Sequence, residues 1–221
     1  MSDLATYRTR ILQTLLDTGS AIWSTDSIDE AVRYALHAYN LALPLEKTSV
    51  ITLPGDGREI ALDGLDGLIA VTECYWPYDS SASQETWPPN RVRGFFVYRD
   101  DGRPVLVLNQ IDGAMPRAGD ELCLWYSASQ TIQDLDGASA TTLPAEHETL
   151  LVGGAAGQAA MSRALDLIEI AGADLYGTGL MGAWAQRKLN AFTTQLSALG
   201  RAQARMGAPY GAGWKLDKWD V

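Results

Sequence analysis

Residues 150–160 read Leu-Leu-Val-Gly-Gly-Ala-Ala-Gly-Gln-Ala-Ala, and this stretch decides how the helices of the chain pack. It lies inside a segment of helical period that runs from Pro144 to about Ala171, with proline suited to the first position of a helix. Each glycine inside a helix costs up to about 1 kcal/mol relative to alanine. Close approach of another helix backbone would offset that cost. We therefore expect Gly153, Gly154 and Gly157 to be packing positions, either within the subunit or between subunits.

Three further helices are expected on either side of this one. Residues 3–18 place apolar side chains at three- and four-residue steps. A second helix begins at the capping-box pattern of Ser27 and Glu30 and ends before a proline at position 44. The last helix starts near Thr178 and ends near Gly207. Its apolar stripe consists of Leu180, Trp184, Leu189, Phe192, Leu196 and Leu199.

Between the second and third of these helices, the period changes to short apolar runs separated by turn residues, which is typical of antiparallel β structure. The expected strands are Ser49–Leu53, Glu59–Leu62, Leu68–Trp76, Val92–Tyr98, Pro104–Leu108 and Glu121–Ser127. The sequence therefore predicts an α+β fold, a four-helix bundle with an antiparallel β-sheet unit inserted between helices 2 and 3. The expected divisions are 1–43 and 142–206 for the bundle, 44–141 for the inserted β domain and 207–221 for an extended C-terminal arm.

The arm, Gly207–Val221, is rich in glycine and contains a proline, so it is not expected to be helical. Large aromatic side chains are worth most when buried, and they are enriched at the centres of interfaces. We expect the arm to dock on a partner, although it could instead fold back over the core of its own chain. The candidate docking residues are Tyr210, Trp214, Lys215, Leu216, Lys218 and Trp219. A long polar loop, 77–90, adds Trp87 as a candidate loop contact.

Composition limits the class of protein. The 221 residues carry a formal net charge of -10 with a pI near 4.6, which argues against wholesale binding to phosphate backbones. The basic residues from Leu180 onward make that end locally basic, which fits a solvated helix face with Lys and Arg near a helix C-terminus, or else head-to-tail association or an acidic partner. No signal peptide and no apolar run of about 18 residues is found, so a cytosolic product without a membrane span is expected. Cys74 and Cys123 are expected to be buried free thiols.

The sequence offers little for catalysis. The chain has two histidines, His37 and His147, and both are expected to be ordinary helix residues. The run of glycines after residue 150 lacks the Lys-Ser/Thr ending of a phosphate-binding loop. Asp134 and Asp136 precede a glycine, but the remaining ligands of a calcium loop are missing. We therefore expect no enzyme activity, no cofactor and no metal.

Four segments, taken in chain order after the helical hairpin, carry a resemblance to a known family. They are Gly-Asp-Gly-Arg-Glu-Ile-Ala-Leu at 55–62, Ile-Gln-Asp-Leu-Asp-Gly-Ala at 132–138, Thr-Thr-Leu-Pro-Ala-Glu-His-Glu at 141–148 and Leu-Leu-Val-Gly-Gly-Ala-Ala-Gly at 150–157. The chain resembles the adaptor, or head-completion, proteins of the head-to-tail connector of tailed bacteriophages. The resemblance covers most of the chain in layout, and residues 132–160 are its most specific part. The sizeable β insertion departs from the smaller connector proteins.

The resemblance implies a virion protein of the neck, between capsid and tail, that is present in the host cytoplasm during assembly. It implies a homo-oligomeric ring, a dodecamer, whose helical bundle faces the portal protein and whose arm reaches onto portal subunits. Tail, stopper or terminator proteins would be further partners, and genomic DNA would pass through the channel without specific binding. Two alternatives stay open. One is a tail-completion or tail-terminator ring protein, and the other is a soluble module that binds a small ligand or peptide between Trp76, Trp87 and Trp125.

Overall fold

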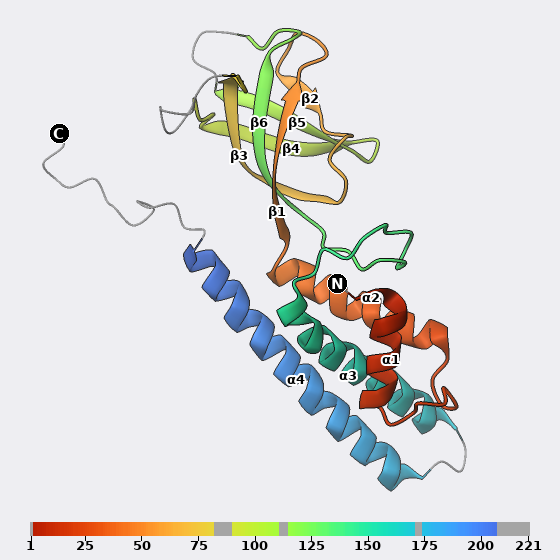
Figure 1. Ribbon diagram of the computed structural model, residues 1–221. Helices are drawn as coiled ribbons and strands as arrows, with labels where there is room; N and C mark the ends of the chain where they lie inside the picture. The colour runs from red at the N-terminus through yellow and green to blue at the C-terminus, as the bar shows by residue number, and fades with distance from the viewer. Residues whose placement is uncertain (1, 82–89, 111–114, 171–173, 207–221) are drawn as a thin grey trace, which may run out of the picture. The chain divides into compact units, whose positions relative to one another are not determined.

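The computed structural model describes residues 2–81, 90–110, 115–170 and 174–206 (Figure 1). The chain forms two compact units, one containing Met1–Leu43 with the residues from Gln130 onward, and the other containing Pro44–Ser129. Helices make up the first unit and antiparallel sheets the second, so the α+β class is confirmed.

The boundary of the β unit differs from the expected one. Residues 130–141 belong to the helical unit because the backbone N–H of Leu4 donates to the carbonyl of Gln133 at 3.1 Å. The side chains of Ile132 and Leu135 are also buried in the helical core. This attachment depends on contacts between segments more than 120 residues apart in the chain, which local sequence patterns do not reveal.

The first two helices are shorter or begin earlier than expected. Helix α1 spans Leu4–Thr14, and the chain leaves it through Leu16, whose φ of 58° is left-handed. Helix α2 spans Thr25–Ala42, and Ser24 is its N-cap, accepting a hydrogen bond from the backbone N–H of Ser27 at 3.2 Å. The capping box expected at Ser27 and Glu30 is therefore wrong. An equally good cap three residues earlier starts the helix one turn sooner.

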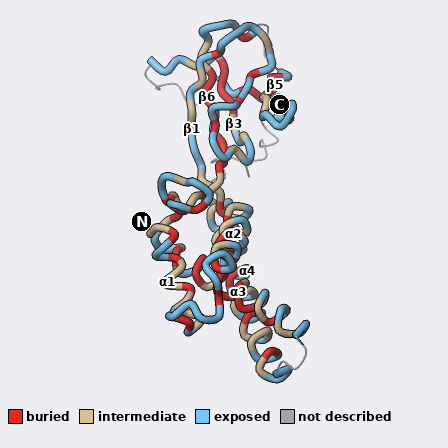
Figure 2. The backbone as a smooth tube through the Cα atoms, turned by 90° about the vertical axis from the view of Figure 1, so that its right-hand side faces the viewer, coloured by how far each residue is buried: buried red, intermediate tan, exposed pale blue. Residues whose placement is uncertain are grey.

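Helix α3 is the centre of the helical unit. A short 3₁₀ turn, η1 (Ala145–His147), leads into α3 (Glu148–Glu169), and α4 spans Leu175–Met206. Helix α3 contacts α1, α2 and α4. Its small residues are buried along most of its length, as the red positions in Figure 2 indicate. Helix α4 begins before the expected Thr178, which is buried, and the Asp174 carboxylate accepts from the backbone N–H of Tyr176 at 3.0 Å.

Two of the three glycines in α3 face α4 of the same chain. A Cβ added to Gly154 would lie 2.8 Å from the ring of Phe192. One added to Gly157 would lie 3.0 Å from Cβ of Lys188. At Gly153 an added Cβ meets nothing within 4 Å. Packing inside the subunit therefore accounts for the close approach at Gly154 and Gly157.

The β unit consists of two three-stranded antiparallel sheets (Figure 1). The strand orders are β1-β6-β3 and β2-β5-β4. The strands are β1 (Leu45–Thr52), β2 (Glu59–Ala61), β3 (Leu68–Tyr78), β4 (Gly94–Asp100), β5 (Arg103–Gln110) and β6 (Glu121–Ala128). Strand β1 begins four residues before the expected Ser49, because Leu45 to Thr48 pair with β6. Both sheets contribute side chains to one core, with Leu106 of β5 and Leu124 of β6 fully buried in it.

Candidate interaction surfaces

The polar residues next to η1 are engaged within the chain. The ring Nδ1 of His147 lies 2.6 Å from the hydroxyl of Tyr39. Glu148 accepts from the hydroxyl of Ser2 at 2.9 Å and forms an ion pair with Arg10 at 2.8 Å. Burial raises the pKa of Glu148, but the hydrogen bonds from Ser2 and the charge of Arg10 outweigh it and hold the pKa below its usual value. These groups join the first residues of the chain to the start of α3.

The Asp134 to Gly137 turn forms an ion pair. One guanidinium nitrogen of Arg33, on α2, lies 2.7 Å from the Asp136 carboxylate. The other terminal nitrogen lies 2.6 Å from the Glu30 carboxylate. The hydrogen bond from Arg33 lowers the pKa of Asp136. Asp134 and Asp136 both have positive φ, 68° and 52°, as aspartate tolerates in tight turns. Among the residues that the structure describes, no group of three or more His, Cys, Asp or Glu side chains could hold a metal ion.

The two cysteines are free and buried in the β unit. Burial raises the pKa of the Cys74 thiol to about 12, with a smaller contribution from the nearby Cys123. Burial also raises the pKa of the Cys123 thiol. Since the thiolate is the nucleophilic form of cysteine, neither residue is arranged for covalent chemistry at neutral pH.

The expected ligand site between three tryptophans does not form between the two that are described. Trp76 belongs to the core enclosed by the two sheets. Trp125 lies between Leu124 and Tyr126, which both face that core, so the alternation of a strand points Trp125 to the opposite face. There its ring lies 6.1 Å from the ring of Tyr75. Trp87 lies outside the described residues.

Among the described residues of the helical unit, exposed large apolar side chains gather where α3 ends and α4 begins. We call it the hairpin tip. It consists of Leu165, Ile168, Ile170, Leu175, Tyr176 and Leu180, whose exposed fractions range from 52% to 77%. Each of these six side chains is more than half exposed, and exposed large apolar groups that gather in one place mark interaction sites. Exposed and intermediate positions dominate this end of the hairpin in Figure 2.

An apolar groove of about 210 Å³ lies between the end of α1, the loop that follows it, and the helices α3 and α4. It is lined by Thr14, Leu15, Leu16, Trp23, Ala160, Met181 and Trp184. Leu16 combines a left-handed backbone with a side chain that is 92% exposed. A leucine is strained in that conformation, and a side chain this exposed gains almost no stabilisation from burial in the helical core. The groove and the hairpin tip therefore form two neighbouring apolar features of the helical unit.

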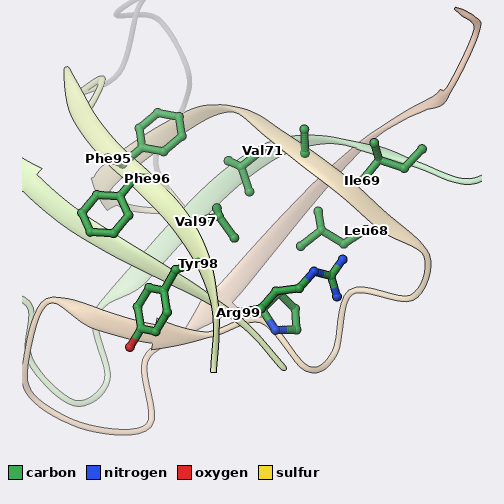
Figure 3. Close-up of a pocket in the computed structure, with 10 residues that line it drawn as sticks. Leu68, Ile69, Val71, Phe95, Phe96, Val97, Tyr98 and Arg99 are labelled. Carbon is green, nitrogen blue, oxygen red and sulfur yellow. The ribbon is translucent and has the colours of Figure 1, made fainter. Parts of the chain in front are cut away.

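The β unit carries a hollow of its own, which we call the β3–β4 groove (Figure 3). Its volume is about 400 Å³, and its walls are residues 68–71 of β3 and 95–99 of β4, with Pro104 of β5 beside them. Figure 3 shows Val97 pointing from β4 toward Val71 and Leu68 of β3, with Arg99 at the end next to Leu68. Both β3 and β4 are edge strands of their sheets.

Sequence reasoning missed the hairpin tip and the β3–β4 groove. Leu180 was expected on the buried stripe of the last helix, but it is 55% exposed, whereas Phe192 and Leu196 of that stripe are buried. The run Phe95-Phe96-Val97-Tyr98 was a signal for the groove, because it is apolar on both faces of a strand. The candidate docking residues Tyr210, Trp214, Lys215, Leu216, Lys218 and Trp219 lie outside the described residues.

Comparison with known proteins gives no relative: no protein-family model matches the chain, and no curated protein is significantly similar to it. Within the described part of the chain, none of the helices has the length and apolar character needed to span a membrane.

Proposed function

We propose that the chain is a structural virion protein of a tailed phage, a ring-forming adaptor that joins the portal of the capsid to the tail and continues the DNA channel. The observation that carries this proposal is the hairpin tip. Large apolar side chains that are exposed together at one place on a protein surface mark sites where a partner binds. A repeated contact through one such surface, made against a different surface of the next copy, closes into a ring when the rotation allows it.

Further features support the same role. The residues around η1 and the Asp134 turn are satisfied by partners within the chain, so a structural role accounts for them. The net charge of -10 suits a channel through which DNA passes without binding, because like charges repel the phosphate backbone. In this proposal the four helices act as a bundle that faces the portal. Tail, stopper or terminator proteins meet the ring on its other side, and the ring is a dodecamer.

The proposal is tested by the mass of the purified protein, alone and mixed with a cognate portal, measured by light scattering and negative-stain imaging. A ring in either sample is expected. The double substitution Leu175→Asp and Tyr176→Asp should abolish it, because burying two carboxylates in an apolar contact is strongly unfavourable. The matched control is Leu41→Asp on α2, where the leucine is 74% exposed away from the hairpin tip. A protein that stays monomeric and ignores the portal would overturn the adaptor role.

A peptide-binding module is the second candidate, and the β3–β4 groove is the observation that favours it. Saturable binding of a short apolar peptide by a protein that stays monomeric in the same mass measurement would select this candidate. A tail-terminator ring is distinguished from the adaptor by mixing the ring with tail tubes in place of the portal.

A further inference from the structure

Strand β4 carries apolar side chains on both faces, and both faces are exposed. Val97 lies opposite Leu106 in the register with β5, so the two side chains share one face. Leu106 is fully buried, whereas Val97 is 38% exposed. On the other face, Phe96 and Tyr98 are 47% and 36% exposed, with ring centroids 6.3 Å apart (Figure 3). Among the described residues β4 pairs only with β5, and an exposed apolar edge strand is a template for a further strand.

The turn between β4 and β5 fixes which backbone groups of β4 point to this edge. Asp101 and Gly102 both have positive φ, 47° and 82°, as in the type I′ turn of a two-residue hairpin. Such a turn is closed by a hydrogen-bonded pair, which is Asp100 and Arg103 here. Hydrogen-bonded and non-hydrogen-bonded pairs alternate along an antiparallel ladder. The even-numbered residues of β4 therefore bond to β5, and the odd-numbered residues direct their N–H and C=O groups outward.

The far side of β5 agrees with this alternation. The carbonyl of Pro104, which lies opposite Arg99, accepts from the backbone N–H of Leu62 at 2.9 Å. Leu62 directly follows β2, on the side of β5 away from β4. The pair of Arg99 and Pro104 is thus a non-hydrogen-bonded one. The outward backbone groups of β4 are those of Phe95, Val97 and Arg99.

The charges at the two ends of β4 are opposite in sign. Arg93 stands just before the strand and Asp101 just after it, and both are exposed. An antiparallel copy of β4 centred on Val97 places Arg93 of each chain opposite Asp101 of the other, and opposite charges in that position stabilise a strand pair. A shift by two residues in one direction would place Arg93 opposite Arg99, and a shift in the other direction would leave Arg93 beyond the turn. Charge therefore selects the register centred on Val97.

We propose that two copies of the chain pair through β4, as antiparallel edge strands related by a two-fold axis at Val97. The β2-β5-β4 sheets of the two copies then form one continuous sheet. The outward groups of Phe95 and Arg99 bond to each other across the axis, and those of Val97 bond to the same residue of the second copy. Phe96 of each copy lies beside Tyr98 of the other, which covers the exposed rings.

A second copy fits this edge because every feature of the edge is its own complement under a two-fold axis. Such a contact is isologous and closes after two copies. The odd-numbered side chains of the second copy fill the β3–β4 groove, which Val97 and Arg99 line. The contact concerns the β unit alone, and it does not rest on the adaptor role or on the hairpin tip.

The test uses the full chain carrying Leu175→Asp and Tyr176→Asp, so that the hairpin tip does not contribute to the mass. In sedimentation equilibrium the mass should rise with concentration to that of two chains. Phe96→Asp should weaken the pairing at least tenfold, because a carboxylate would enter the aromatic contact. The matched control is Val50→Asp on β1, where the valine is 42% exposed, and it should leave the mass unchanged. A single-chain mass at every concentration, or equal effects of the two substitutions, would overturn the proposal.

A charge exchange examines the register. Arg93→Glu alone and Asp101→Lys alone each place like charges opposite one another at both ends, and each should weaken the pairing about tenfold. In an equimolar mixture of the two variants, the new glutamate faces the new lysine at one end, and the native arginine faces the native aspartate at the other. The mixed pair should therefore form as tightly as the unaltered one. Damage to the turn would not be rescued by mixing, and a mixture without recovery would contradict the register.

Hydrogen exchange resolved by residue identifies the backbone groups. The amides of Phe95, Val97 and Arg99 should exchange at least tenfold more slowly in concentrated than in dilute protein. The amides of Phe96 and Tyr98, which bond to β5, should exchange equally in both. Protection of the outward amides at every concentration would assign the edge to a segment of the same chain, and protection that needs added portal would assign it to that partner; either result overturns the proposal. Since the hairpin tip is altered throughout, this proposal and the adaptor role fail separately.

Discussion

Alanine substitutions at Gly153 and Gly154 should change stability in opposite directions, although the two residues are neighbours in the same helix. In an open helix position, replacing glycine by alanine stabilises by about 0.5–1 kcal/mol, because alanine loses less backbone freedom on folding. Gly153 is such a position, since an added Cβ meets nothing within 4 Å. We expect Gly153→Ala to raise the free energy of unfolding by that amount.

At Gly154 the same change meets a buried aromatic ring. The added Cβ would lie 2.8 Å from two ring carbons of Phe192, and Phe192 is only 2% exposed, so the ring has no free space into which to move. Overpacking of this kind costs about 1–3 kcal/mol. After the helix-propensity gain of up to about 1 kcal/mol, the net loss for Gly154→Ala is about 1–2 kcal/mol.

The assay is urea unfolding followed by far-UV circular dichroism, which reports mainly the helical unit. Phe192→Leu provides a further check, because shortening the ring should remove part of the clash. In a double-mutant cycle, Gly154→Ala should then be less destabilising in the Phe192→Leu background than in the unaltered protein. If Gly154→Ala stabilises the protein as much as Gly153→Ala does, the close contact between α3 and α4 is refuted.

Three further predictions concern single polar groups. The pKa of Glu148 is lowered from its ordinary value of 4.5 in the folded state. The ionised carboxylate therefore stabilises the protein above pH 4.5, and this stabilisation is lost as the pH falls through the folded pKa. When the free energy of unfolding is measured against pH, Glu148→Gln should make its decrease at acidic pH less steep. Tyr39→Phe removes the hydrogen bond to His147 and should lower the unfolding free energy by about 1 kcal/mol in urea titrations; an unchanged midpoint would show that the bond contributes nothing. Because burial raises the pKa of both thiols, Cys74 and Cys123 should react with a thiol reagent at neutral pH only after denaturant is added, and rapid labelling of the native protein would contradict their burial.

The sequence predicts that each helix and strand exists, but it does not predict where they begin and end. The apolar period identified the segment that became α2, yet Ser24 rather than Ser27 caps it. Both serines satisfy the local rule, and the choice between them depends on how the preceding loop is anchored by the rest of the unit. Helix α1 ends sooner than its apolar stripe suggested, because Leu16 turns into a left-handed conformation.

The candidate site was predicted less well than the fold. The sequence pointed to residues 207–221 and to Trp87, which lie outside the described residues, and to Gly154 and Gly157, which pack against α4. The hairpin tip was not predicted, because exposed and buried apolar residues look the same in a helical stripe. Leu180 and Phe192 both occur at stripe positions, but Phe192 belongs to the buried core whereas Leu180 is 55% exposed.

The sequence by itself determined the α+β class, the number of helices and strands that the described residues show, and the need for a close contact along the glycines of α3. These properties follow from residues near one another in the chain, whose spacing decides whether one face or two can be buried. Only the tertiary structure decided that the strands divide into two sheets, that residues 130–141 join the helices, and that the apolar side chains of β4 and of the hairpin tip are exposed among the described residues. Each of these depends on which distant segment lies alongside, and that is settled by packing across the whole unit.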